Sequence, residues 1–292
     1  MVTVRDRDRI KDLLRQVEER YDVKVLMAVE SGSRAWGFAS PDSDFDVRFV
    51  YQEPLERMIR LFPDRDVIEE MTPYHEDGTG VPIDLVGWSL PKTLRLAVAS
   101  NPQLCEWARG TVTYLSDPEF TPELRRLTSQ ASPRVLAHHY RGLAKKTVLD
   151  YLSGPEDPVG KKYLYAVRSV LAASWMLDHP TPGSAPPVRF DRLRKETRVP
   201  DPVSVEIDTL LRWKVGLGET RARRRFPVLD AWVGSELDRL KEAVPSLPDP
   251  EVDREVAEQV LMARVLPPVP DKPTPSEGGW TLEDEADFNS LF

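Results

Sequence analysis

Apolar residues follow two different patterns along the chain, and the pattern changes near residue 115. Before that point, helical spacing over Val4–Tyr21, with Ile10, Leu13, Leu14 and Val17 on one face, precedes apolar runs typical of strands. After it, helical spacing dominates in segments bounded by Pro or Gly, which cover residues 121–130, 133–152, 158–177, 202–215, 227–243 and 251–263. We therefore expect an α+β fold, with a small mixed sheet in residues 1–115 and an α-helical accessory domain in residues 116–265.

Residues 266–292 form a third segment, in which helical spacing is lost. Prolines at positions 267, 268, 270, 273 and 275 make this segment a poor helix, and its acidic residues outnumber its basic ones. We predict a flexible acidic tail. Its aromatic and leucine residues offer a short docking motif for a protein partner, although simple disorder accounts for the same composition.

The formal net charge of −8 argues at first against a nucleic-acid ligand, but the charge is unevenly distributed. Basic residues outnumber acidic ones in residues 134–168 and 189–225, so the middle of the chain is basic enough to meet phosphates. The single cysteine, Cys105, excludes an intramolecular disulfide. No apolar run is long enough for a signal peptide or a membrane span, so we expect a cytoplasmic protein with no membrane partner.

A Gly-Ser turn follows the first strand pattern, which covers residues 23–30. The backbone must turn sharply at Ser31, Gly32 and Ser33, and a glycine there lets backbone amides approach a phosphate closely. Ser33 adds a hydroxyl donor, and a short helix beginning at Arg34 would favour an anion at its start. This turn therefore predicts a triphosphate site that involves Gly32, Ser33 and Arg34.

An Asp-x-Asp pair follows the Gly-Ser turn after a ten-residue spacer, at the start of the strand pattern over residues 44–51. Residues two apart on a strand point to one face, so Asp44 and Asp46 project together. Two adjacent carboxylates repel unless a cation lies between them, and hard oxygen ligands favour Mg²⁺ or Mn²⁺. An Asp-x-Asp alone is usually a solvated pair. It is the combination with the Gly-Ser turn that predicts a metal and phosphate site.

The string GSRAWGFASPDSDFDVRFVY, residues 32–51, resembles the nucleotidyltransferases of the DNA polymerase β superfamily, and in particular the RNA-repair-associated family often called RlaP. The resemblance continues over residues 83–114 and 161–175 and thus covers roughly the first two thirds of the chain. It implies a polymerase β-type catalytic domain. The implied reaction transfers a nucleoside monophosphate (NMP) from a nucleoside triphosphate (NTP) to an acceptor hydroxyl, with release of pyrophosphate.

Enzymes of this superfamily need a third carboxylate on a neighbouring strand, and the resemblance assigns that role to Asp84. It lies in the apolar string VPIDLVGW, where an acidic side chain is costly unless it reaches a cation or a cleft. Residues 66–72 read as the hairpin partner of this strand. Other acidic residues nearby compete for the role, namely Asp64, Asp66, Glu69, Glu70 and Asp77.

A basic stripe marks the helix predicted over residues 158–177. Lys161, Tyr165 and Arg168 share a face, so Lys161 or Lys162 with Arg168 could hold triphosphate oxygens while Tyr165 packs against a base or sugar. A solvated basic face with a half-buried tyrosine has the same pattern. The resemblance favours nucleotide contact, and does so more weakly for Lys145.

The sequence does not determine which molecule accepts the NMP. The resemblance implies an RNA end, but a protein hydroxyl, a small molecule, or a nucleotide-binding scaffold that has lost catalysis fits the same residues. Neither the preferred NTP nor the oligomeric state follows from the sequence.

Overall fold

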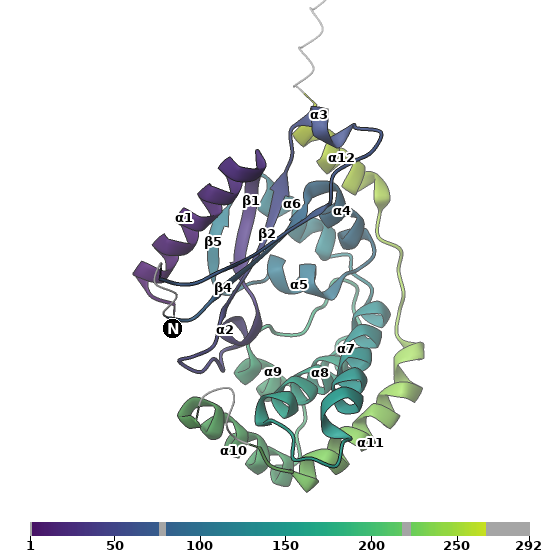
Figure 1. Ribbon diagram of the computed structural model, residues 1–292. Helices are drawn as coiled ribbons and strands as arrows, with labels where there is room; N and C mark the ends of the chain where they lie inside the picture. The colour runs from purple at the N-terminus through teal and green to yellow at the C-terminus, as the bar shows by residue number, and fades with distance from the viewer. Residues whose placement is uncertain (1, 76–79, 218–222, 267–292) are drawn as a thin grey trace, which may run out of the picture.

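The computed structural model describes residues 2–75, 80–217 and 223–266. Figure 1 shows a sheet with helices on both faces in one half of the molecule and a group of helices in the other. The expected α+β class is confirmed. The predicted acidic tail, apart from residue 266, and the competing carboxylate Asp77 lie outside the described residues.

The sheet is mixed and has five strands in the order β3-β4-β2-β1-β5. β2 and β4 are parallel, and all other pairs are antiparallel. The expected strands form close to their predicted positions, and the predicted hairpin is β3 with β4. The short β5 was not predicted, because four residues are too few to establish an alternating pattern. The strands are β1 (Lys24–Glu30), β2 (Phe45–Gln52), β3 (Val67–Thr72), β4 (Ile83–Ser89) and β5 (Thr113–Ser116).

One face of the sheet is covered by α1 (Val4–Tyr21). Thr3 and Asp6 form a capping box that starts this helix, and its apolar face is buried as predicted, with Leu14 and Val17 in one core with Val47 and Phe49 of β2. The alternation of β2 therefore directs these two residues toward α1 and leaves Asp46 and Arg48 on the opposite face.

The opposite face of the sheet is covered by several helices that share one core with Val29 and Val50. After α11, the chain returns along the side of the molecule so that α12 packs on this core (Figure 1). Arg264 of α12 is ion-paired with Asp117. The carbonyl oxygen of Arg264 accepts a hydrogen bond from Nε2 of Gln52 at 3.0 Å. These helices are α4 (Leu90–Val98), α5 (Pro102–Ala108), α6 (Phe120–Thr128) and α12 (Arg254–Val265).

The helical half is built around α8, which is buried along most of its length and packs against α7, α9, α10 and α11. The helix expected over residues 133–152 is α7 followed by a π-helical segment, η1. The helices of this half are α7 (Pro133–Thr147), η1 (Val148–Leu152), α8 (Gly160–Asp178), α9 (Phe190–Glu196), α10 (Asp201–Leu217) and α11 (Pro227–Ala243). The short segments α2 (Gly32–Trp36), α3 (Leu55–Met58) and η2 (Val244–Ser246) complete the described elements.

Two helices of the predicted accessory domain pack on the sheet. α6 and α12 fall within residues 116–265, yet they share a core with α4 and α5 over the sheet. The division into two domains at residue 115 stays a prediction. Among the helices that the structure describes, none has the length and apolar character needed to cross a bilayer.

The contact between Gly87 and Phe49 tests the register of the central strands. The two residues are paired across β4 and β2, and a Cβ at Gly87 would lie 2.1 Å from the Phe49 ring. We expect Gly87→Ala to lower the free energy of unfolding by about 1–3 kcal/mol, measured by urea denaturation. The control is Gly142→Ala in α7, where nothing lies within 4 Å and alanine should be neutral or stabilise by up to about 1 kcal/mol. Equal effects at both positions would contradict the register.

Candidate functional site

The Gly-Ser turn and the Asp-x-Asp pair are packed directly against each other. Gly32 has φ +58°, and a Cβ at this position would lie 1.9 Å from Oδ2 of Asp46. The amide of Ser31 donates to the carbonyl oxygen of Asp46 at 2.8 Å. Glycine is therefore required here for two reasons, the left-handed backbone and the close approach of a carboxylate.

The parallel pairing of β2 with β4 brings two of the predicted carboxylates together. Asp46 and Asp84 are register partners near the N-terminal ends of these strands. Asp44 is exposed and immediately precedes β2, and its carbonyl oxygen accepts a hydrogen bond from Nε of Arg34 at 2.9 Å. Asp84 thus lies on the strand next to Asp46, as expected. Glu69, which competed for this role, lies on the edge strand β3 and is ion-paired with Arg65.

Arg48 lies between the two carboxylates and was not singled out from the sequence. Its Nη2 donates to Oδ1 of Asp46 at 3.1 Å and to Oδ2 of Asp84 at 2.9 Å. Its Nη1 donates to the carbonyl oxygens of Val47 at 3.1 Å and of Asp84 at 3.2 Å. The signal was present, because Arg48 follows Asp46 by two residues on a strand and must share its face.

The donor chemistry of Asp44, Asp46 and Asp84 fits a hard divalent cation. Asp46 and Asp84 are both ion-paired with one cation of the protein, the guanidinium of Arg48. Among the described residues, however, no three acidic, histidine or cysteine side chains are gathered around a single point. The residues suit a metal, but Asp46 and Asp84 share Arg48 in the arrangement that the structure shows.

Glu30 contacts the backbone of Asp46 and was also not predicted from the sequence as a site residue. It ends β1, is buried, and accepts a hydrogen bond from the amide of Asp46 at 3.0 Å and another from the hydroxyl of Tyr114. Burial raises the pKa of Glu30 to about 7. A glutamate at the end of an apolar strand was the only sequence signal, and its two partners are distant in the chain.

The predicted phosphate residues lie on and beside the short helix α2 (Gly32–Trp36). Ser33 is buried, and its carbonyl oxygen accepts hydrogen bonds from the amides of Gly37 and Phe38, each at 3.1 Å. Arg34 lies over the ring of Phe45 at 4.0 Å and donates to carbonyl oxygens in the loop before β2. In the structure Arg34 holds this loop, and its contact with a nucleotide stays a prediction.

The predicted residues of α8 divide into two groups. Tyr165 packs edge-on against Trp36 of α2, with ring centroids 5.5 Å apart, so α8 contacts the helix that carries the Gly-Ser turn. Lys161 and Lys162 are partly exposed in the first turn of α8, where Nζ of Lys162 lies 3.6 Å from the ring centroid of Tyr151. Lys145 is exposed on α7. Of these four residues, the structure shows Tyr165 in contact with α2, the helix that carries the Gly-Ser turn.

Arg168 is buried within a network centred on Glu106 of α5. Oε1 of Glu106 accepts hydrogen bonds from Arg168 Nη2 at 3.0 Å and from the Tyr140 hydroxyl at 2.8 Å. Its Oε2 accepts from Nε1 of Trp36 at 3.2 Å, and the Arg168 guanidinium lies 4.2 Å from the centroid of that indole ring. Because Arg168 is only 3% exposed, it joins α2, α5 and α8 in this structure, and its contact with a triphosphate stays a prediction.

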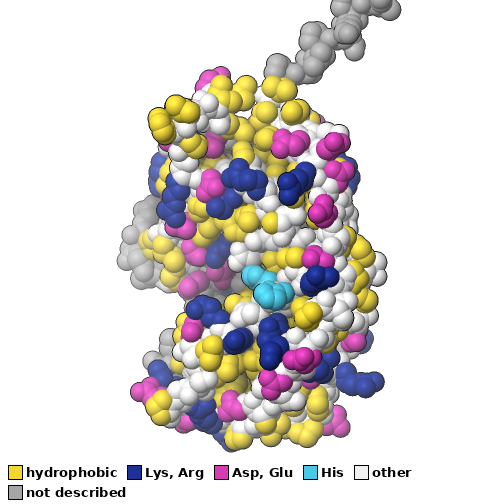
Figure 2. Space-filling view, turned by 90° about the vertical axis from the view of Figure 1, so that its right-hand side faces the viewer, with side chains coloured by type: hydrophobic (Ala, Val, Ile, Leu, Met, Phe, Trp, Pro, Cys, Tyr) yellow, Lys and Arg dark blue, Asp and Glu magenta, His cyan; other side chains and the backbone are white. Residues whose placement is uncertain are grey.

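The basic residues do not form one continuous patch on the face shown in Figure 2. Lys and Arg side chains alternate there with acidic ones above and below the indentation between the two halves.

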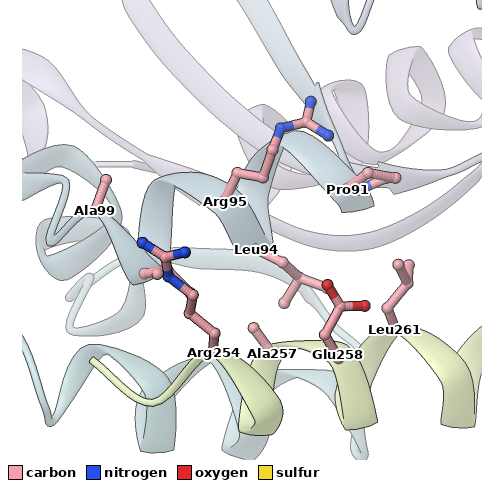
Figure 3. Close-up of a pocket in the computed structure, with 9 residues that line it drawn as sticks. Pro91, Leu94, Arg95, Ala99, Arg254, Ala257, Glu258 and Leu261 are labelled. Atoms are coloured by element: carbon pink, nitrogen blue, oxygen red, sulfur yellow. The ribbon is translucent and has the colours of Figure 1, made fainter. Parts of the chain in front are cut away.

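A cavity of about 500 Å³ lies between α4 and α12, and Leu94, Arg95, Ala257 and Leu261 contribute to its lining (Figure 3). The predicted carboxylates are not part of that cavity.

Comparison with known proteins identifies relatives over most of the chain. A family model described as the RNA repair pathway DNA polymerase beta family (RlaP) matches residues 7–263. An uncharacterized protein of Bacillus subtilis (strain 168), YcgL, is 39% identical over 242 residues, which are 82% of this chain and 89% of YcgL. The crystal structure of a nucleotidyltransferase-like protein from Exiguobacterium sibiricum aligns over 97% of this chain and 89% of its own, at 13% identity. The TM-score of this alignment is 0.30.

The Glu106 network predicts a large stability effect. Glu106→Ala leaves the buried Arg168 guanidinium without a carboxylate, so we expect the free energy of unfolding to fall by about 3–5 kcal/mol in urea denaturation. The control is Glu123→Ala, which removes an exposed pair with Arg126 and should cost less than about 1 kcal/mol. Similar losses in the two variants would show that the network does not join the helices.

Proposed function

The chain belongs to the RNA repair pathway DNA polymerase beta family, and from this membership we propose that it is a metal-dependent nucleotidyltransferase. In the proposed reaction an acceptor hydroxyl attacks the α-phosphorus of an NTP, an NMP is transferred, and pyrophosphate leaves. The observation that carries the proposal is the pairing of Asp46 with Asp84 across parallel strands, directly beside the Gly-Ser turn.

Asp44, Asp46 and Asp84 are the residues that would hold Mg²⁺ or Mn²⁺. When bound, such ions stabilise the charge on phosphoryl oxygens and lower the pKa of an attacking hydroxyl. Asp46 is well suited to this role because its amide is bonded to Glu30 and its carboxylate rests against Gly32, so the side chain is positioned from two sides. Asp84 is assigned to the acceptor side, where it would stabilise loss of the hydroxyl proton.

The triphosphate is assigned to the turn that begins α2. Backbone amides at Gly32 and the hydroxyl of Ser33 would hold the β- and γ-phosphates, with Arg34 beside them. Tyr165 would pack against the base or sugar, because it already contacts Trp36 of the same short helix. Lys161, Lys162 and Lys145 would supply positive charge at the edge of this site, whereas Arg168 would act mainly by holding Trp36.

An RNA end is the acceptor that the family description favours, and the basic surplus in residues 134–168 and 189–225 supports it. A protein hydroxyl and a small molecule are the alternatives within the same chemistry. A nucleotide-binding scaffold without turnover is a different class of function, and the presence of all three carboxylates argues against it.

Substitution of the paired carboxylates tests the proposed chemistry. We expect Asp46→Asn and Asp84→Asn each to lower NMP transfer on the order of 100-fold or more, since each removes a charge that acts in the transition state. The assay uses each labelled NTP, Mg²⁺ or Mn²⁺, and a pool of RNAs with defined ends. The control is Glu69→Gln, an exposed acidic residue on β3, which should keep wild-type transfer. Unchanged transfer in both Asn variants would exclude the assignment.

The RNA acceptor is tested by the salt dependence of binding. If several Lys and Arg side chains contact the RNA backbone, its affinity should fall by about tenfold or more as salt rises from about 50 to 200 mM, measured by fluorescence anisotropy with a labelled RNA. Binding that does not respond to salt, together with label transferred to a co-expressed protein, would instead indicate a protein acceptor.

A further inference from the structure

Arg48 occupies an unusual place, because one nitrogen of its guanidinium contacts two carboxylates on neighbouring strands. Nη2 lies 3.1 Å from Oδ1 of Asp46 and 2.9 Å from Oδ2 of Asp84. The exposed fractions of the three side chains are 19%, 30% and 26%, respectively, so the cluster is screened from solvent but still accessible.

The two carboxylates need a positive charge between them. Neighbouring strands lie about 5 Å apart, and two ionised carboxylates at such a separation repel each other strongly when they are partly withdrawn from water. Asp46 cannot readily turn away, because Gly32 lies against its Oδ2 and Glu30 holds its amide. The guanidinium of Arg48 relieves this repulsion in the structure.

We propose that Arg48 is an internal counter-cation, which holds the Asp46–Asp84 pair together in the nucleotide-free protein and is displaced when a divalent cation binds there. This inference rests on the proposed function, because it concerns the metal site of that reaction. It assigns Arg48 as a positioning residue that regulates when the site accepts a metal.

The physical reason is competition for the same oxygens. Mg²⁺ requires its ligands at about 2.1 Å, and a guanidinium bound to the same two carboxylates would place another positive charge within a few ångströms of the ion. Arg48 is also bound by the carbonyl oxygens of Val47 and Asp84 through Nη1. These neutral contacts can retain one end of the guanidinium after Nη2 has left the carboxylates.

The consequence is coupling between metal and nucleotide. A free divalent ion must displace Arg48 without help, so it should bind the nucleotide-free protein weakly. An NTP brings additional negative charge and phosphate ligands, which favour the ion over the guanidinium. Arg48 would in this way prevent the site from holding a metal before the substrate arrives.

Mn²⁺ binding to the nucleotide-free protein tests this inference. Free Mn²⁺ is measured by electron paramagnetic resonance during titration with MnCl₂, without NTP or acceptor. We expect Arg48→Gln to bind Mn²⁺ roughly 5- to 150-fold more tightly than the wild type, the usual range of coupling free energies between binding events. Arg48→Lys retains the charge and should stay close to the wild type. Arg20→Gln, which removes an exposed pair with Glu70, is the matched control and should have no effect.

The added affinity must come from the carboxylate pair, so Asp84→Asn introduced into Arg48→Gln should abolish it. If Arg48→Gln is unfolded without metal, addition of Mn²⁺ should restore its folded circular dichroism spectrum. A folded Arg48→Gln variant that binds Mn²⁺ no more tightly than the wild type, or an unfolded one that Mn²⁺ does not restore, overturns the inference. Arg48 would then be a structural partner of the two carboxylates that stays in place when the metal binds.

The two proposals can fail separately. Tight Mn²⁺ binding by Arg48→Gln without NMP transfer by the wild type would refute the proposed reaction and leave the role of Arg48 intact. Normal transfer by the wild type, with unchanged Mn²⁺ affinity in Arg48→Gln, would refute only the role of Arg48.

Discussion

The parallel pairing of β2 with β4 is the constraint on which the rest of the site depends. It sets Asp46 beside Asp84 and Phe49 beside Gly87, so one register determines both the polar cluster and the packing beneath α1. Because side chains alternate along a strand, a shift by one residue would move the carboxylates into the apolar core. The core therefore enforces the register, and the register assembles the acidic pair.

Two carboxylates that are wholly or largely withdrawn from solvent, Glu30 and Glu106, contribute contacts around this site. Glu30 joins the end of β1 to the amide of Asp46 and to Tyr114, while Glu106 joins the motif helix α2 to α7 and α8. Each accepts hydrogen bonds from several donors, which offsets the cost of withdrawing an acidic group from water. Trp36 contacts both Glu106 and Arg168 and thus joins the helical half to the short helix that begins at the Gly-Ser turn.

The sequence predicted the longer elements well because their periodic patterns are long. The predicted bounds of α1 and α11 agree with the structure, and the hairpin that carries Asp84 forms as expected. The short elements β5, α4 and α9 were not predicted, since a few residues do not establish a period. The packing of α12 beside α4 also could not be predicted, because a helical pattern indicates that one face is apolar but not which surface it covers.

By itself the sequence determined the class of fold, the Gly-Ser turn and the family. These depend on spacing and residue type along one segment. Only the tertiary structure placed Arg48 between Asp46 and Asp84 and buried Arg168 against Glu106, because both arrangements join strands or helices that are far apart in the chain. Alternation could place Arg48 on the right face, but its partner Asp84 is chosen by the register of β2 with β4. The Gly-Ser and Asp-x-Asp motif thus supplies the groups of the candidate site, and the fold decides which charges surround them.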